Sequence, residues 1–298
     1  MIKNAMSLKA KINNIAKKEK VLPQAVMQTY MLERLLERIS ISEYKDNFIL
    51  KGGMLISSII GIDNRSTMDM DTTIKGFKLD KENLENILQE IIKIDIDDNI
   101  KFKIISIEYI REDDDYWGLR VHLQASFDEM PIDLKIDVTT GDKITYKEIN
   151  YKYNLLLEKR SIEIWTYNVE TIIAEKYESI IKRSILNTRI RDFYDLYMLT
   201  HLDKKNIKSK MLVDAIRETS KHRGTFNIIN DRNVVEDVIN SIQNDNFLKE
   251  QWNKYQLSYE YAKDIKYEQL IDSIIAIKEI YLTLSWALYL ELCILLRE

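Results

Sequence analysis

The sequence is poor in the residues that make turns, crosslinks and soft-metal sites. Its 298 residues include two prolines, seven glycines, three histidines and one cysteine. So few turn residues argue against a Greek-key sandwich or a string of small domains on flexible linkers. The single cysteine, Cys293, excludes an intrachain disulfide and fits a reducing cytoplasm. The N-terminus lacks the pattern of a signal peptide, so we expect a cytoplasmic protein.

Several common site types are also missing. The three histidines, His122, His201 and His222, are scattered along the chain, and the cysteine stands alone. Neither a zinc site nor a Cys–His nucleophile is therefore expected. The sequence has no Walker loop and no Gly-x-Gly-x-x-Gly run, which excludes the commonest phosphate-binding loops.

Charged residues are abundant but unevenly distributed. They make up 31% of the chain, hydrophobic residues make up 45%, and the net charge is −4. The segment 169–224 nevertheless holds 12 Lys and Arg against 8 Asp and Glu. This local excess permits a phosphate-binding face on an acidic protein, although lysine-rich helical faces are often only solvated.

The most apolar segment is 280–296, near the C-terminus. It contains Glu291 and is shorter than the roughly 20 apolar residues that a membrane span needs. We therefore expect a buried C-terminal helix and no membrane association. A partner-binding tail is the alternative.

The pattern of apolar residues divides the chain into a strand-rich first part and a helical second part. Six of the seven glycines lie between Gly52 and Gly141. Alternating or β-branched runs predict strands, and apolar residues spaced by three and four predict helices. The expected strands are 46–50, 67–74, 101–110, 119–127, 132–139 and 161–167. The expected helices are two within 7–41, then 54–60, 81–93 and several after 169. We expect an α/β fold with a small mixed sheet, and domains 1–168 and 169–298.

One stretch combines the features of a nucleotide and metal site. Gly52-Gly53 follows an expected strand, precedes a short helix, and lies upstream of Asp69-Met-Asp71 on the next strand. Residues i and i+2 of a strand point to the same side, so the two carboxylates can hold Mg²⁺ together with phosphate oxygens and water. A glycine pair at a helix N-terminus presents unhindered N–H groups to a triphosphate.

The acidic pair is weak as an isolated signal, since Asp95/Asp97 and Asp113/Asp115 have the same spacing. The glycine pair and the leading Arg65 and Thr67 make the combination more specific. A two-metal site needs a further carboxylate from a neighbouring strand. Asp137 is our candidate, because an acid between two apolar neighbours on a strand is costly without a partner. The alternative is an edge strand whose acids face water.

These motifs resemble those of the AbiEii family of nucleotidyltransferase toxins, which is related to the MenT toxins and belongs to the polymerase-β-like superfamily. The resemblance rests on the Gly-Gly turn, on the run from Arg65 to Asp71, and on Ala174-Glu-Lys176 with the later run from Asn187 to Leu196. It covers about residues 45–200. The chain departs from the superfamily pattern in having Gly53 as the second residue of the turn and a longer gap to Asp69.

The resemblance implies a role for each matching position. Asp69 and Asp71 would bind the metal, Gly52 and Gly53 would bind the nucleotide phosphates, and Lys176 and Asp192 would complete the catalytic site. Arg65 is a further candidate for phosphate contact. A surface lysine, a helix-surface ion-pair cluster around Asp192 and Asp195, and an exposed loop arginine are the alternatives.

The implied function is a Mg²⁺-dependent toxin of a bacterial toxin–antitoxin and abortive-infection, phage-defence system. It would transfer a nucleoside monophosphate from an NTP to an RNA acceptor, the tRNA 3′ end in relatives, and would have a separately encoded antitoxin. Two rival functions stay open. One is adenylylation of a small cationic antibiotic, which needs an acidic pocket, and the other is non-catalytic nucleotide binding.

Overall fold

The computed structural model describes residues 4–110, 118–202 and 207–295, with side chains up to residue 285. Contacts between residues divide the chain into two compact units. The first comprises Met1–Asp142 with Glu148–Tyr167, and the second comprises Lys143–Lys147 with Asn168–Glu298. We keep 1–168 and 169–298 as the proposed domains and describe the two units separately.

The first unit is built on a mixed sheet of seven strands in the order β3-β4-β5-β2-β1-β7-β6. The pairs β1–β7 and β2–β5 are parallel, and the other neighbours are antiparallel. The described strands are β1 Phe48–Lys51, β2 Asp69–Ile74, β3 Ile100–Ile110, β4 Gly118–Phe127, β5 Met130–Thr140, β6 Ile149–Asn154 and β7 Ser161–Thr166.

Strands β4 and β5 alternate between buried and half-exposed residues, so one face of the sheet is apolar and the other is polar. The buried set is Leu119, Val121, Leu123, Ala125, Leu134, Ile136 and Val138. This alternation is the pattern that predicts the two strands, and it fixes their register, because a slip of one residue would expose the whole apolar set. The polar face carries the candidate carboxylates.

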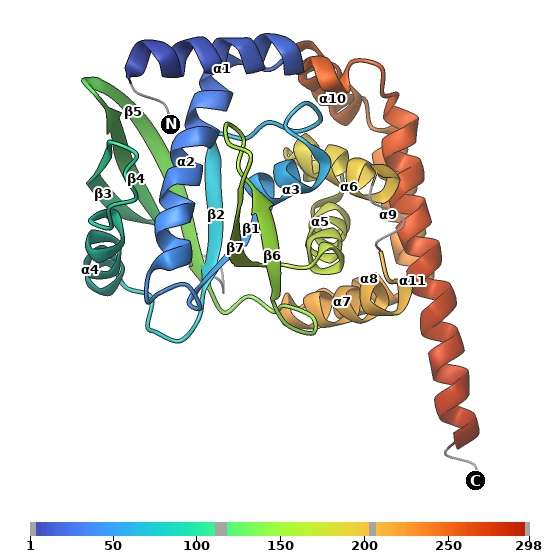
Figure 1. Cartoon of the computed structure of the whole chain (residues 1–298). Coiled ribbons are helices and arrows are strands. Elements are labelled where there is room, and N and C mark those ends of the chain that lie inside the picture. The colour runs from blue at the N-terminus through green and yellow to red at the C-terminus, as the bar shows by residue number, and fades with distance from the viewer. Residues whose placement is uncertain (1–3, 111–117, 203–206, 296–298) are drawn as a thin grey trace. The chain divides into compact units, whose positions relative to one another are not determined.

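Four helices belong to this unit: α1 Ala5–Glu19, α2 Pro23–Ile41, α3 Gly52–Ile60 and α4 Lys81–Ile92. Helix α2 lies over the sheet and contacts β2, β5 and β7, while α4 packs on β3 (Figure 1). Pro23 occupies the first turn of α2, where a missing N–H is harmless. The Asp80 carboxylate caps α4 by accepting from the N–H of Asn83.

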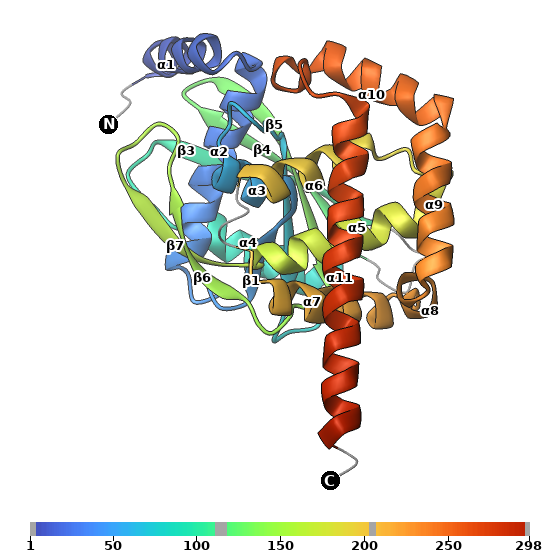
Figure 2. The same cartoon turned by 90° about the vertical axis from the view of Figure 1, so that its right-hand side faces the viewer.

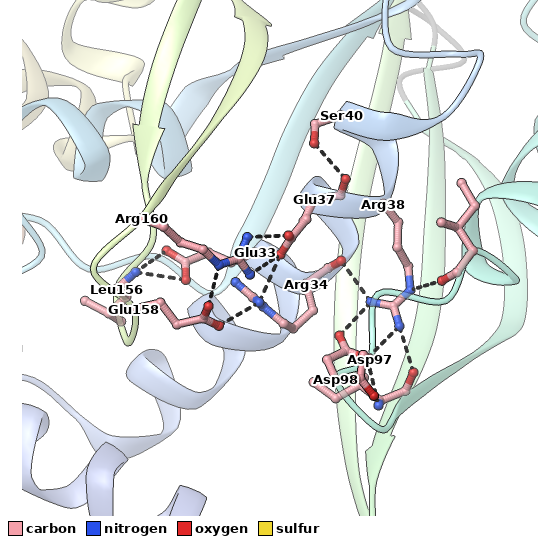
Figure 3. Close-up of polar contacts among 12 residues, drawn as sticks. Glu33, Arg34, Glu37, Arg38, Ser40, Asp97, Asp98, Leu156, Glu158 and Arg160 are labelled. Atoms are coloured by element: carbon pink, nitrogen blue, oxygen red, sulfur yellow. Dashed lines mark hydrogen bonds and ion pairs between the residues drawn. The ribbon is translucent and has the colours of Figure 1, made fainter. Parts of the chain in front are cut away.

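Helix α2 also buries charged side chains (Figure 3). Arg34 is 1% exposed, and its Nη1 lies 2.8 Å from Glu158 Oε1 and 3.0 Å from Glu37 Oε2. Arg160 donates to both carboxylate oxygens of Glu37. The turn between β6 and β7 is thereby tied to the helix by ion pairs whose α2 side chains are buried and whose turn side chains are partly exposed.

Glu33 of α2 is the buried acid of this network. It is 1% exposed, and both of its carboxylate oxygens accept from the N–H of Leu156 at 3.1 Å. Burial raises the pKa of Glu33 to about 8, although the Leu156 N–H and the charge of Arg34 oppose the rise. Glu33 is therefore mostly protonated in the folded protein at neutral pH.

We expect Glu33→Gln to stabilise the protein at pH 8 but not at pH 5. Between the unfolded pKa of 4.5 and the folded pKa of about 8, the folded chain holds a proton that the unfolded chain has lost. Stability of the wild type should then fall by up to about 1.4 kcal/mol per pH unit across this window and level off above it. Urea unfolding at several pH values measures the difference. The exposed Glu43→Gln is the control, and a gap between Glu33→Gln and wild type that is equal at every pH would contradict the expectation.

The second unit is helical. Its central helix α5 contacts α6 and α7, and the long α11 runs along α6, α7 and α9 (Figure 2). The described helices are α5 Val169–Arg183, η1 Ser184–Leu186, α6 Ile190–Leu202, α7 Ser209–His222, α8 Phe226–Asn230, α9 Arg232–Asn244, α10 Asn246–Ser258, η3 Glu260–Ala262 and α11 Tyr267–Leu295. Asn168 caps α5 by accepting from the N–H of Thr171 at 2.8 Å.

The α/β fold class with a mixed sheet is confirmed, and one strand was missed. Strand β6 is an edge strand in which Tyr153 is buried while its sequence neighbours are exposed. Residues 280–295 of the apolar segment belong to α11, and Tyr281 and Leu282 are buried. Its later side chains lie outside the described residues, so burial of the tail stays a prediction. In the part of the chain that is described, no helix has the length and apolarity to cross a membrane.

Candidate active site

The Gly-Gly turn connects β1 to the first turn of α3. Gly52 has φ +67°, a conformation that favours glycine, and a Cβ there would lie 2.1 Å from Asp71 Oδ2. Only glycine at this position lets the Asp71 carboxylate approach the backbone so closely. The residue before it, Lys51, is the N-cap of α3 and makes no side-chain capping bond to the first turn. The start of α3 is therefore not capped by its own N-cap side chain.

Gly53 packs against the loop that leads into β2. A Cβ at this position would lie 2.8 Å from Thr67 Oγ1 and 2.9 Å from Arg65 Nη2. Arg65 is only 3% exposed and donates to the carbonyl of Ser66. Arg65 is therefore not an exposed loop arginine. The guanidinium supports the glycine turn from within, and its contact with a nucleotide stays a prediction.

Asp69 and Asp71 lie on the same face of β2, as expected from their spacing. Both are half-buried, whereas Met70 between them is fully buried on the opposite face. In the parallel register with β5, Asp69 is opposite Lys135 and Asp71 is opposite Asp137. Lys135 Nζ lies 3.3 Å from Asp69 Oδ1. The three candidate carboxylates therefore share the polar face of two adjacent strands.

Asp137 is engaged by a cation on the next strand. Arg120 Nε and Nη2 each donate to one carboxylate oxygen of Asp137, at 2.8 Å. These hydrogen bonds raise the pKa of Arg120 above its ordinary value. Across β4, β5, β2 and β1 the polar face thus reads Arg120, Asp137, Asp71 and Lys51 in register. Asp137 is not an acid on an edge strand, because β5 is an inner strand of the sheet.

Lys51 is a site residue that the sequence analysis missed. Its Nζ lies 2.5 Å from Asp142 Oδ2 and 2.7 Å from Thr139 Oγ1. Burial alone would raise the pKa of Asp142, but the Lys51 ammonium and hydrogen bonds from threonine side chains lower it well below its usual range. This ion pair ties the end of β1, where the glycine turn begins, to the end of β5. The position of Lys51 directly before Gly52 was the available signal.

The pair of Asp69 and Asp71 is chemically suited to bind a divalent cation. Two half-buried carboxylates on one strand face leave room for phosphate oxygens and water, which Mg²⁺ prefers as its other ligands. The missing Cβ of Gly52 leaves the space that the Asp71 carboxylate occupies. Within the described residues, no group of three or more His, Cys, Asp or Glu is placed to hold a metal ion. The role of Asp137 as a third ligand therefore stays a prediction.

The downstream candidates meet in the helical unit. Lys176 of α5 has its Nζ 2.5 Å from Asp192 Oδ1 and 3.2 Å from Asp195 Oδ2, both on α6. The side chains of Asp192 and Asp195 are 10% and 0% exposed, and that of Lys176 is 20% exposed. Neither a solvated lysine nor a helix-surface ion-pair cluster describes this arrangement. It is a nearly buried cation between two carboxylates.

The Asp95–Asp97 pair, the other Asp-x-Asp sequence among the described residues, does not form a comparable site. Asp95 and Asp97 lie in the loop between α4 and β3, where Asp97 donates its N–H to the Asp95 carboxylate. Asp113 and Asp115 lie outside the described residues. The spacing alone was therefore uninformative, and the glycine turn before β2 was the useful part of the motif.

Comparison with protein families shows the family of the chain. Residues 34–273 match the family described as nucleotidyl transferase AbiEii toxin, type IV TA system. The chain belongs to this family. Membership confirms the resemblance inferred from the glycine turn and the Asp69–Asp71 pair, and it implies an NTP substrate, typically a divalent metal, and an antitoxin partner. The match includes both units, so it extends past the region on which the resemblance was based.

Two solved structures are similar to this AbiEii-family chain. One is a candidate nucleotidyltransferase from H. pylori, with 16% identity, a TM-score of 0.48, and coverage of 89% of this chain and 99% of that one. The other is JHP933 from Helicobacter pylori, with 16% identity, a TM-score of 0.46, and coverage of 89% and 97%. A search of the curated proteins found no match.

Proposed function

We propose that this protein is a Mg²⁺-dependent toxin that transfers a nucleoside monophosphate from an NTP to the 3′ end of an RNA, tRNA being the expected acceptor. Family membership supports the transfer and the toxin–antitoxin context. The close packing of the Asp71 carboxylate on Gly52 is the observation that supports the site most directly, because it joins the acidic pair to the glycine turn. A role in phage defence, a cytoplasmic location and a separately encoded antitoxin complete the proposal.

In the reaction, a hydroxyl oxygen of the acceptor forms a bond to the α-phosphorus, the bond to the β-phosphate oxygen breaks, and pyrophosphate leaves. Bound between Asp69 and Asp71, Mg²⁺ would supply a Lewis acid for the phosphate oxygens. The N–H groups of Gly52 and Gly53 would bind phosphate at the start of α3. Asp137 is the candidate base for the hydroxyl proton.

Two lysines have further proposed roles, one in binding phosphate and the other in supporting the glycine turn. Lys176 is a compact cation suited to the phosphates of the nucleotide or pyrophosphate, and Asp192 would keep its ammonium in position at 2.5 Å. Lys51 would hold the glycine turn through Asp142 without touching the nucleotide. The two roles differ in their expected kinetics, because a phosphate contact acts on substrate binding and a support of the turn acts on the geometry of the site.

The local excess of Lys and Arg in segment 169–224 favours a polyanionic acceptor over a cationic antibiotic. Several of its cations are exposed at the surface, whereas Arg223 is consumed by Glu175 and Glu178 at 2.6 and 3.0 Å. The exposed cations include Lys182, Arg183, Lys208 and Lys210. Cations of this kind attract RNA phosphates and repel an aminoglycoside.

The experiment is a labelling reaction with Mg²⁺, each of the four labelled NTPs, and either total bacterial tRNA or a panel of aminoglycosides. Label at the RNA 3′ end supports the proposal. Label on the antibiotic alone would replace it with the resistance-type activity. Binding of NTP without transfer to any acceptor would favour the non-catalytic function.

A further inference from the structure

The helical unit contains a cluster of aromatic rings beside the first turn of α6. The rings come from α6, α10 and the turn around η3, and neighbouring centroids are 4.6 to 6.4 Å apart. The members are Tyr194, Trp252, Tyr255, Tyr259 and Tyr261. Tyr194, Trp252 and Tyr255 are at most 7% exposed and form an ordinary core. Tyr259 and Tyr261 are only half-buried.

The two outer rings form a small surface with an arginine. Tyr259 and Tyr261 stack at a centroid distance of 5.2 Å and an interplanar angle of 23°. Arg191 Nη2 donates to the Tyr259 hydroxyl at 2.8 Å, and its guanidinium carbon lies 5.6 Å from the centre of that ring. We call these three residues the tyrosine shelf. Planar rings with an adjacent guanidinium are the groups on which proteins stack nucleobases.

The shelf is held in place by the turn that carries it. The side-chain amide of Gln256 donates to the carbonyls of Ala262, Lys263 and Ile265 at 3.1, 2.9 and 2.9 Å. Trp252 Nε1 donates to the Ile265 carbonyl as well, at 3.1 Å. These bonds fix both ends of the segment that contains Tyr261. A fixed ring loses little conformational entropy when a ligand stacks on it.

The shelf adjoins the candidate phosphate-binding residues of the same unit. Arg191 and Asp192 are consecutive in the first turn of α6, so their Cα atoms are about 3.8 Å apart. The Asp192 side chain meets Lys176, and the Arg191 side chain meets Tyr259. The first turn of α6 therefore contacts Lys176 of α5 through Asp192 and Tyr259 through Arg191. This is the order of groups along a nucleotide, with phosphate at one end and base at the other.

We infer that Tyr259 and Tyr261, with Arg191 beside them, stack a nucleobase in the nucleotidyl-transfer reaction. The inference rests on the proposed function, because the ligand is a nucleotide only if the protein transfers one. The base belongs either to the incoming NTP or to the end of the RNA acceptor, and stacking chemistry is the same for both. Stacking adds affinity with little dependence on which base is stacked. The shelf therefore positions the nucleotide more than it selects among nucleotides.

The test compares ligands with and without a base. The wild type and Tyr259→Ala are titrated calorimetrically in Mg²⁺ with each NTP, with inorganic tripolyphosphate, and with a short single-stranded RNA. Tyr259→Ala should weaken the best NTP, or the RNA, by about tenfold or more and leave tripolyphosphate binding unchanged. Tyr259→Phe, which keeps the ring and loses only the hydroxyl contact with Arg191, should restore the affinity. A loss for NTP assigns the base to the nucleotide, and a loss for RNA alone assigns it to the acceptor.

Two controls separate a binding role from a structural one. Tyr197→Ala removes a half-buried tyrosine of α6 whose ring centre lies 4.1 Å from that of His201, and it should leave every affinity unchanged. Thermal unfolding reports whether Tyr259→Ala or the companion Tyr261→Ala remains folded. Equal weakening of NTP and tripolyphosphate, or unchanged affinity for both NTP and RNA, overturns the shelf. A wild type that binds neither NTP nor tripolyphosphate overturns the proposed function, and the shelf with it.

Discussion

Replacing Asp69 or Asp71 by asparagine should lower nucleotide transfer by about a thousandfold or more, the scale expected when a group that stabilises transition-state charge is removed. Asparagine keeps the size of the side chain and removes the negative charge that a hard cation requires. The loss should therefore appear as weaker dependence of NTP binding on Mg²⁺ as well as lost activity. Calorimetric titration of NTP with and without Mg²⁺ measures the first effect, and the labelling reaction measures the second.

Stability distinguishes this loss from unfolding. The pair between Asp69 and Lys135 is 3.3 Å long, with side chains 43% and 44% exposed, so its loss should change the free energy of unfolding by less than about 1 kcal/mol. The matched control is Asp133→Asn on β5, an exposed acid of the same polar face whose carboxylate accepts from Gln124 at 3.0 Å. Full transfer by a folded Asp69→Asn protein would show that the metal site lies elsewhere.

The local part of the site could be predicted because it depends on residues close in sequence. The spacing of Asp69 and Asp71 puts them on one strand face whatever the rest of the fold is, and Met70 is buried on the other face as expected. The glycine pair likewise marks a turn on its own. The sequence cannot state which strand lies beside β2, because that depends on contacts between residues more than 60 positions apart.

The partners of the site residues were the part that could not be predicted. Arg120 meets Asp137 across β4 and β5, and Lys51 meets Asp142 from β1. Each pair depends on which strands are neighbours and on which residues face each other across them, whereas alternation specifies only the face on which a side chain lies. Strand β6 was missed for a related reason. It lies at the sheet edge, where only part of one face is buried, so its weak alternation was not recognised.

Burial also decides how the sequence around Asp192 and Asp195 should be interpreted. In the sequence, Asp192 and Asp195 stand among arginines, which favours a helix-surface ion-pair cluster as strongly as a site. In the structure they point to Lys176, and Asp195 is fully buried. The sequence spacing of i and i+3 gives the shared helix face but not the element that covers it. Lys176 from α5 covers that face. The pairing of Lys176 with Asp192 and Asp195 therefore holds the two helices together, and it is also the proposed phosphate-binding group.

Lys176→Met should therefore destabilise the protein as well as abolish transfer. Removal of the ammonium leaves two nearly buried carboxylates facing each other, and breaking a buried ion pair costs about 3 kcal/mol or more. Denaturant unfolding measures this loss. The matched control is Lys182→Met on the same helix α5, whose side chain is exposed, and it should change neither stability nor NTP affinity.

Combining Lys176→Met with Asp192→Asn and Asp195→Asn separates the two roles of the lysine. With both carboxylates neutralised, no unpaired charge remains buried, so the triple variant should regain much of the stability that Lys176→Met loses. Transfer should stay absent, because the cation proposed to bind phosphate is still missing. NTP affinity should also remain low in the triple variant. If stability and transfer recovered together, Lys176 would only neutralise two buried acids, and the phosphate contact would have to be assigned to another residue.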